Sequence, residues 1–114
     1  MLERLLMYYV YMLKCADDSF YIGMTSNLER RIFEHQNGLI EGYTSSRRPV
    51  ELVWSCAFAT HDEAFTRERQ IKGWTRAKKE ALIKEDWDQI HKIVKQERKT
   101  RNERNNKKQQ KSAP

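Results

Sequence analysis

Two short runs rich in aromatic and β-branched residues, separated by a polar turn, form the clearest pattern in the chain. They lie within Met7–Met24, and residues 16–19 between them are Ala-Asp-Asp-Ser. This pattern predicts a β-hairpin. Successive side chains of a strand point to opposite faces, so Tyr9 and Tyr11 should share a face, and in the right register Tyr11 stands beside Tyr21. By itself the pair is explained more simply by the strand preference of tyrosine.

Beyond the hairpin the spacing of apolar residues changes to that of a helix. Residues 26–29, Ser-Asn-Leu-Glu, fit a capping box. A helix is therefore expected to begin near Leu28 and to end before Gly38. At about 100° per residue, Leu28 and Ile32 mark its buried face.

The rest of the chain predicts one more strand and further helices. An alternating pattern gives the strand one core face, made of Val50, Leu52, Trp54, Cys56 and Phe58. A second capping box at 60–63 predicts a helix through about Gly73, with an apolar stripe of Ala64, Phe65 and Ile71. Thr75 is expected to cap a helix through about Glu85, and residues 87–94 suggest one or two more amphipathic turns.

Arg31 and His35 are the first candidate functional residues. They lie four positions apart on one edge of the first predicted helix, which places them at the rim of the core. Such a pair is usually an ordinary surface pair. Beside two tyrosines it is a candidate anion site, because the arginine fork matches phosphate oxygens.

Glu68 is the most unusual charged residue, because it falls within the apolar stripe of the predicted helix 61–73. A carboxylate there is unfavourable unless it is paired or binds a metal. One interpretation is a buried ion pair with Arg31 or a neighbouring lysine. The other is a ligand for a hard divalent cation such as Mg²⁺.

Taken together, these motifs resemble the GIY-YIG nuclease family. Tyr9-Val10-Tyr11 stands where the family has Gly-Ile-Tyr, and Tyr21-Ile22-Gly23 matches the second half of its motif. The family's arginine falls on Arg31, its histidine on His35 and its metal-binding glutamate on Glu68. The ordered set with this spacing is specific, although each half-motif is weak alone.

The resemblance runs from about Met7 to about Lys84 and is closest to small stand-alone, single-domain members. These are similar to the catalytic domain of the excision-repair incision subunit. The resemblance implies an α/β fold in which helices flank a small, mostly antiparallel three-stranded sheet. It also implies a metal-dependent endonuclease that hydrolyses phosphodiester bonds in DNA, in repair or recombination, with Mg²⁺ or Mn²⁺ bound at Glu68.

The resemblance further implies separate roles for the catalytic residues. Tyr11 would be the general base, although the pKa of a phenol, about 10, must be lowered by neighbouring cations for this role. Arg31 would bind the phosphate, and Tyr21 would orient water or a non-bridging oxygen. His35 would hold the Tyr11 proton or a phosphate.

Two other functions fit the same residues. The chain could be a nucleic-acid-binding module that keeps the nuclease fold and cuts nothing. It could also be a structural interaction domain in which the tyrosines and Glu68 only complete a core. Cleavage that a chelator stops distinguishes the first function, and salt-sensitive binding without cleavage the second.

Length and composition set the outer limits. The 114 residues suit one domain with a modest core. No segment has the apolar length of a membrane span, and 1–10 is too short and too mixed for a secretory signal. Cys15 and Cys56 lack metal-ligand spacing and are expected to be reduced thiols, as in a cytoplasmic protein.

Positive charge is unevenly distributed. The chain carries a net charge of +6, and residues 95–114, with eight Lys and Arg against two Glu, account for all of it. Residues 1–94 are expected to form the nuclease-like domain, and 95–114 a basic tail that is either disordered or a fraying helical arm, able to contact nucleic acid. Within the domain, the cations expected to follow a phosphate backbone, or else to lie on solvated helix faces, are Arg47, Arg48, Lys72, Arg76 and Lys79.

Overall fold

In the computed structural model, residues 6–111 are described, and so are the side chains of this range up to residue 107. The chain divides into two compact units between Trp74 and Thr75. No helix within the described range is long and apolar enough to cross a membrane.

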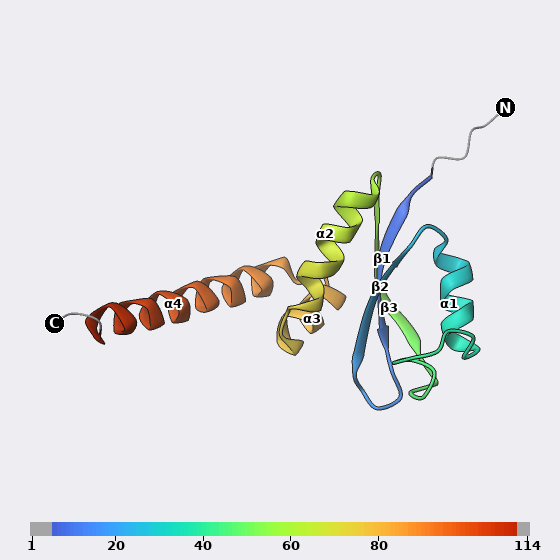
Figure 1. The fold of residues 1–114 in the computed structure, drawn as a ribbon, viewed down its shortest axis with the longest axis horizontal. Coiled ribbons are helices and arrows are strands. Elements are labelled where there is room, and N and C mark those ends of the chain that lie inside the picture. The colour runs from blue at the N-terminus through green and yellow to red at the C-terminus, as the bar shows by residue number, and fades with distance from the viewer. Residues whose placement is uncertain (1–5, 112–114) are drawn as a thin grey trace. The chain divides into compact units, whose positions relative to one another are not determined.

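The first unit is built on a three-stranded antiparallel sheet in the order β2-β1-β3. Its strands are β1 (Tyr8–Lys14), β2 (Phe20–Thr25) and β3 (Glu51–Phe58). Helices α1 (Leu28–Gln36) and α2 (His61–Lys72) cover opposite faces of this sheet (Figure 1). The predicted α/β fold with an antiparallel three-stranded sheet is confirmed.

The hairpin register places the two motif tyrosines on one face of the sheet. Tyr11 lies directly opposite Gly23, and Leu13 lies opposite Tyr21. Residues directly opposite each other in an antiparallel pair share a face, so Tyr11 and Tyr21 are diagonal neighbours with ring centroids 6.3 Å apart. The expectation that they stand side by side is confirmed.

The core under α1 forms on this tyrosine face. Tyr11 and Leu13 are almost fully buried in it, and the partly buried Leu28 and Ile32 of α1 pack against them, as their helical spacing predicted. Cys15 and Val50 complete the buried cluster. Tyr11 is therefore both a core residue and a candidate catalytic residue.

Strand β3 departs from the predicted single core face. Met12 of β1 pairs with Trp54, but the next residue, Leu13, pairs with Leu52, so the register shifts by one residue at Val53. Such a bulge moves the residues on its two sides to opposite faces. Leu52 thus shares the tyrosine face, whereas Trp54 lies on the other face. The alternation in sequence could not reveal an inserted residue.

Helix caps and buried faces follow the predictions with two corrections. Thr60 caps α2, as its Oγ1 accepts a hydrogen bond from the Glu63 backbone N–H. The cap of α1 is Asn27 rather than Ser26, since the Asn27 side chain accepts from the Arg30 N–H. Phe65, predicted in the apolar stripe of α2, is instead 44% exposed. The Phe65 ring stacks on His61. The apolar stripe of α2 therefore lacks Phe65 and is narrower than expected.

The second unit consists of α3 (Arg76–Ile83) and α4 (Trp87–Lys111). Ala81, Leu82 and Ile90 are its buried apolar residues among those described. Lys78 is also buried, and its ammonium forms an ion pair of 3.2 Å with Glu97 of α4. This pair ties the first turns of α4 to α3.

The basic segment, expected to be a disordered or fraying helical arm, forms part of α4 as far as Lys111. Residues 87–111 contain neither Gly nor Pro. They are rich in Lys, Arg, Gln and Glu, which have high helix propensity even where no apolar face is buried. The expected boundary at 94/95 also differs from the division of the structure into units, which falls at 74/75.

Gly23 offers a test of the fold, because the Tyr11 ring lies against it. A Cβ on Gly23 would lie 2.5 Å from Cζ of Tyr11, which forces the ring to move. We expect Gly23→Ala to lower the free energy of unfolding by about 1–3 kcal/mol, as overpacking does. Urea denaturation would measure this change.

Gly73→Ala is the matched control. The nearest atom to a Cβ at Gly73 is a backbone oxygen at 3.6 Å, an ordinary contact. This substitution should leave stability unchanged or raise it by a few tenths of a kcal/mol, roughly, by restricting the unfolded chain. Equal losses in both variants would contradict the close approach of Tyr11 to Gly23.

Candidate active site

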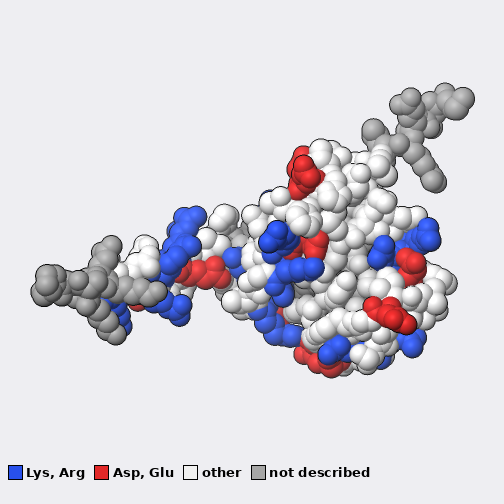
Figure 2. Space-filling view, viewed as in Figure 1, with Lys and Arg blue, Asp and Glu red and all other residues white. Residues whose placement is uncertain are grey.

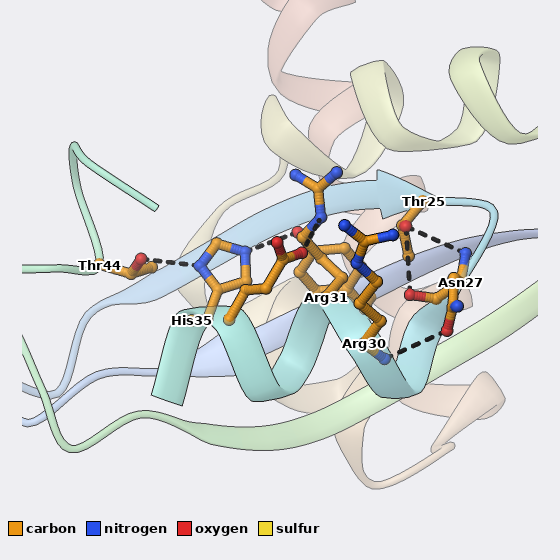
Figure 3. A network of polar contacts seen from close by, with 8 residues as sticks. Thr25, Asn27, Arg30, Arg31, His35 and Thr44 are labelled. Atoms are coloured by element: carbon orange, nitrogen blue, oxygen red, sulfur yellow. Dashed lines mark hydrogen bonds and ion pairs between the residues drawn. The ribbon is translucent and has the colours of Figure 1, made fainter. Parts of the chain in front are cut away.

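A line of buried polar side chains crosses the space between the sheet and α1. The Tyr11 hydroxyl lies 2.8 Å from Nε2 of His35. On the other side of the imidazole, Nδ1 lies 2.8 Å from Oγ1 of Thr44. Figure 3 shows the His35 ring held between these two partners. All three residues are at most 2% exposed, so both ring nitrogens are committed to protein groups.

His35 therefore lies deeper than the sequence indicated. It was expected at the rim of the core but is 1% exposed. Its position on α1 explains the difference, since it is seven residues after Leu28 and three after Ile32, and such positions share one helix face. Because His35 is buried, it can take up the proton of Tyr11 but cannot contact a phosphate.

An aromatic stack extends from the tyrosine face to the loop after α1. The Tyr21 ring lies 5.1 Å from that of His35 and stacks on Tyr43 at 6.1 Å. The Arg47 guanidinium lies over the Tyr43 ring at 3.8 Å. Arg47 also forms a 3.0 Å ion pair with Asp17 in the hairpin turn. The loop is thus attached to Tyr21 of the second half-motif and to the hairpin turn that precedes β2.

Burial decides the electrostatics of the buried pair. It raises the pKa of Tyr11 well above the ordinary value, and the nearby Tyr21 and Glu68 act in the same direction, while Arg31 opposes them. Burial also lowers the pKa of His35, as does the positive charge of Arg31. At neutral pH the resting site therefore holds a phenol and a neutral imidazole. The expected lowering of the Tyr11 pKa by cations occurs through Arg31 but is outweighed.

Arg31 is close enough to act on both groups and is not committed to a strong pair. Its Nε lies 3.5 Å from a Glu34 carboxylate oxygen, and its side chain is 41% exposed. The Nε atom itself is buried and has no hydrogen-bond partner among the described residues. The exposed part of the Arg31 guanidinium suits a phosphate oxygen.

Glu68 is buried and forms an ion pair, as one of its two interpretations from the sequence expected. It is 7% exposed, as predicted for the buried face of α2, and its Oε1 lies 2.5 Å from Nζ of Lys72, one turn later. The ion-pair partner is thus a neighbouring lysine rather than Arg31. The Lys72 side chain is 54% exposed and can move into solvent.

The donor set near Glu68 suits only a sparsely coordinated metal. Within the described part of the chain, no group of three or more His, Cys, Asp or Glu could hold an ion. Mg²⁺ at phosphoryl-transfer sites is typically bound by one or two carboxylates together with waters and substrate phosphates. Glu68 fits that mode, provided that the Lys72 ammonium leaves Oε1.

Four of the five cations expected to contact nucleic acid form contacts within the protein, and the fifth, Lys79, is partly buried. Arg47 stacks on Tyr43, and Arg48 donates a 3.3 Å hydrogen bond to the Ser45 carbonyl. Lys72 pairs with Glu68, as described above. In the second unit, Arg76 pairs with Glu80 at 2.9 Å, and partial burial lowers the pKa of Lys79. Their contact with nucleic acid stays a prediction.

Sequence reasoning missed Thr44 and Tyr43. Both lie in the loop between α1 and β3, where only the basic residues Arg47 and Arg48 had been singled out. The available signal was an aromatic residue followed by a hydroxyl residue, Tyr-Thr, between Gly42 and Arg47. Without a known partner for His35, nothing in the sequence linked this pair to the site.

A groove of the first unit lies away from this line of polar side chains. It has a volume of about 920 Å³ and is lined by residues that include Leu28, Ile32 and Phe33. None of the five predicted catalytic residues is among its lining residues. The candidate site is thus defined by its hydrogen bonds and not by a large cavity.

The Thr44 contact predicts how His35 responds to pH. Because burial and Arg31 lower its pKa, His35 should stay neutral below the ordinary imidazole pKa of about 6.5. Its stabilising contribution is then present above pH ~6.5 and declines as pH falls, when the unfolded state takes up the proton first. ¹⁵N NMR of the imidazole would follow this titration.

Thr44→Val should change the ¹⁵N shifts of His35, and Thr44→Ser, which keeps the hydroxyl, should restore them. Identical spectra for wild type and Thr44→Val would contradict the contact.

Comparison with known proteins identifies the family. The GIY-YIG catalytic domain family matches residues 7–81. A UPF0213 protein of Bacillus pumilus is 47% identical over 78 residues, which cover 68% of this chain and 80% of that protein. A UPF0213 protein of Natronomonas pharaonis is 47% identical over 79 residues, covering 69% and 93%. A protein of E. faecalis solved by solution NMR is 40% identical with a TM-score of 0.51, covering 73% of this chain and 88% of that one. The chain therefore belongs to the GIY-YIG catalytic domain family.

Proposed function

We propose that the protein is a metal-dependent endonuclease that hydrolyses phosphodiester bonds in DNA, acting in the cytoplasm in repair or recombination. The observation that carries this proposal is the buried line Tyr11–His35–Thr44. Arg31 and Glu68 act electrostatically on its phenol. Family membership makes phosphodiester cleavage the reaction to test.

The line of hydrogen bonds offers a path for the proton of the attacking water. A phenol is a stronger donor than an aliphatic hydroxyl, so Tyr11 donates to Nε2 of His35, and the Nδ1–H of His35 donates to Thr44. During attack the water gives its proton to the Tyr11 oxygen while the Tyr11 proton passes to Nε2. The hydroxide forms the new bond to phosphorus while the bond to the leaving oxygen breaks. The leaving oxygen keeps the bonding electron pair and takes a proton from solvent water, and His35 afterwards releases its extra proton through Tyr11. No free phenolate is needed, which removes the obstacle of the raised Tyr11 pKa.

Thr44 acts in this scheme as a positioning residue. By accepting from Nδ1–H it keeps Nε2 free to accept the Tyr11 proton, and it accepts a stronger hydrogen bond once the imidazole is charged. Burial opposes that charge, so the imidazolium should be short-lived and return its proton readily. The lowered pKa of His35 fits a relay better than a proton store.

Arg31 and Glu68 would provide the electrostatic part of catalysis. The exposed Arg31 fork would bind non-bridging phosphate oxygens, where negative charge builds up. Glu68 would hold Mg²⁺ or Mn²⁺ after Lys72 moves away, and such an ion, when bound, would stabilise that charge further. Tyr21, stacked beside His35, would orient the water or a phosphate oxygen.

A nucleic-acid-binding module without activity is the second candidate. It is favoured by the ion pair that occupies Glu68 and by the burial that keeps Tyr11 protonated. Incubation with branched, nicked and linear DNA in the presence of Mg²⁺ or Mn²⁺, read on gels, separates the two. Binding without cleavage on every substrate would favour the module.

Replacing Glu68 by Gln should abolish metal binding and cleavage. The substitution preserves shape and removes the one carboxylate proposed as a ligand, which calorimetric titration with Mn²⁺ would detect. Its effect on stability should be small, about 0.5 kcal/mol or less, because Lys72 is half exposed and is not left as a buried charge. Lys72→Gln is the control: it removes the same ion pair, keeps the carboxylate and should tighten metal binding. An Mn²⁺ titration of Glu68→Gln identical to that of wild type would reject the ligand role.

Replacing Tyr11 by Phe should lower the cleavage rate by about 10²–10⁴-fold, the usual range for general acid–base catalysis. It should also reduce the unfolding free energy by about 1–3 kcal/mol, since Nε2 of the buried His35 loses its partner. DNA binding should survive. Tyr21→Phe should reduce cleavage less. Full cleavage by folded Tyr11→Phe would exclude Tyr11 from the chemistry.

A further inference from the structure

Helix α4 carries a regular row of cations beyond the part that packs on α3. Lysine or arginine occupies every third position from 95 to 107. The five residues of this row, which we call the α4 row, are Lys95, Arg98, Arg101, Arg104 and Lys107. At a rise of about 1.5 Å per residue, successive cations are about 4.5 Å apart along the axis. Each step also turns by about 60°, so the row winds around the helix.

The α4 row is available to a partner. All five of its residues are exposed, and Figure 2 shows blue side chains at both edges of this helix. None of the five forms an ion pair with another described side chain. Of the two acids in the same stretch, Glu97 is engaged by the buried Lys78. Only Glu103 offsets the row locally.

The chemistry of the row limits the class of partner. From Lys95 to Lys107 no apolar side chain is present. A membrane-surface helix needs an apolar face to insert, and a helix that binds a protein groove needs apolar anchors at i, i+3, i+4 and i+7. A partner that is bound by cations alone must carry negative charges at short, regular intervals. The phosphodiester backbone of a nucleic acid is such a partner.

We propose that α4 is a nucleic-acid-binding arm, whose α4 row binds the phosphate backbone without reading sequence. The row lies outside the matched catalytic domain, which ends at residue 81. The formally neutral residues 1–94 contribute no net attraction for a polyanion. The arm thus provides long-range attraction that the catalytic domain lacks. This proposal rests on the proposed function for its choice of nucleic acid as the polyanion.

The test compares two variants in which four cations become glutamine. The arm variant is Arg98→Gln, Arg101→Gln, Arg104→Gln and Lys107→Gln, which keeps residues of good helix propensity. The control variant makes the same change at Lys14, Arg67, Arg69 and Lys84, exposed cations that have no proposed role. Circular dichroism checks that both stay helical. Binding to a 20-base-pair duplex and to a 20-nucleotide single strand is measured by fluorescence anisotropy over a range of NaCl, with EDTA present so that nothing is cut.

The arm variant should lose most of its affinity, and its slope of log K against log[NaCl] should fall by about 3 to 4 for duplex, at about 0.9 per neutralised phosphate. The single strand should show a smaller change, about 3, at about 0.7 per phosphate. The control variant should keep most of both slope and affinity.

Equal losses in the two variants would mean that net charge alone matters, and would overturn the proposal. So would unchanged binding in the arm variant, or wild-type binding to anionic phosphatidylserine vesicles as tight as to DNA. Because the measurement needs no cleavage, a protein that binds through α4 and cuts nothing would contradict only the proposed nuclease function.

Discussion

The hydrogen bond between Tyr11 and His35 is the interaction on which the site depends. It joins the central strand of the sheet to α1 at 2.8 Å inside the core. It is possible only because Gly23, directly opposite Tyr11, leaves room for the phenol ring. A core contact and the proposed proton path would be the same bond, so changes that disturb packing would also disturb the proposed chemistry.

The loop between α1 and β3 completes this arrangement. Thr44 supplies the second partner of His35, and Arg47 returns the chain to the hairpin. The Arg47 guanidinium pairs with Asp17. The backbone carbonyl of Arg47 accepts a 2.9 Å hydrogen bond from the Ala16 N–H. The hairpin turn and the loop thus hold each other, which keeps Thr44 within reach of the imidazole.

In the structure, the charged residues around the site are paired with residues of opposite charge, and a bound substrate would alter this balance. The Lys72 ammonium neutralises Glu68, and Arg31 shares only a 3.5 Å contact with Glu34. A phosphate brought to Arg31 would add negative charge that a divalent ion could offset at Glu68. In this view Lys72 occupies the carboxylate in the resting state and stabilises a charge that would otherwise be buried alone.

The sequence by itself determined the secondary structure, the face shared by Tyr11 and Tyr21, and the unusual burial of Glu68, because these follow from periods of 2 and 3.6 residues. It could not show the bulge at Val53, since one inserted residue leaves the composition of a strand unchanged. Nor could it show that Thr44 meets His35, or which of the two expected partners, Arg31 or a neighbouring lysine, pairs with Glu68. Those contacts depend on how the loop folds back and on which rotamers the packing allows. Tertiary structure also decided the electrostatics, because the depth of burial, and not residue type, raises the Tyr11 pKa and lowers that of His35.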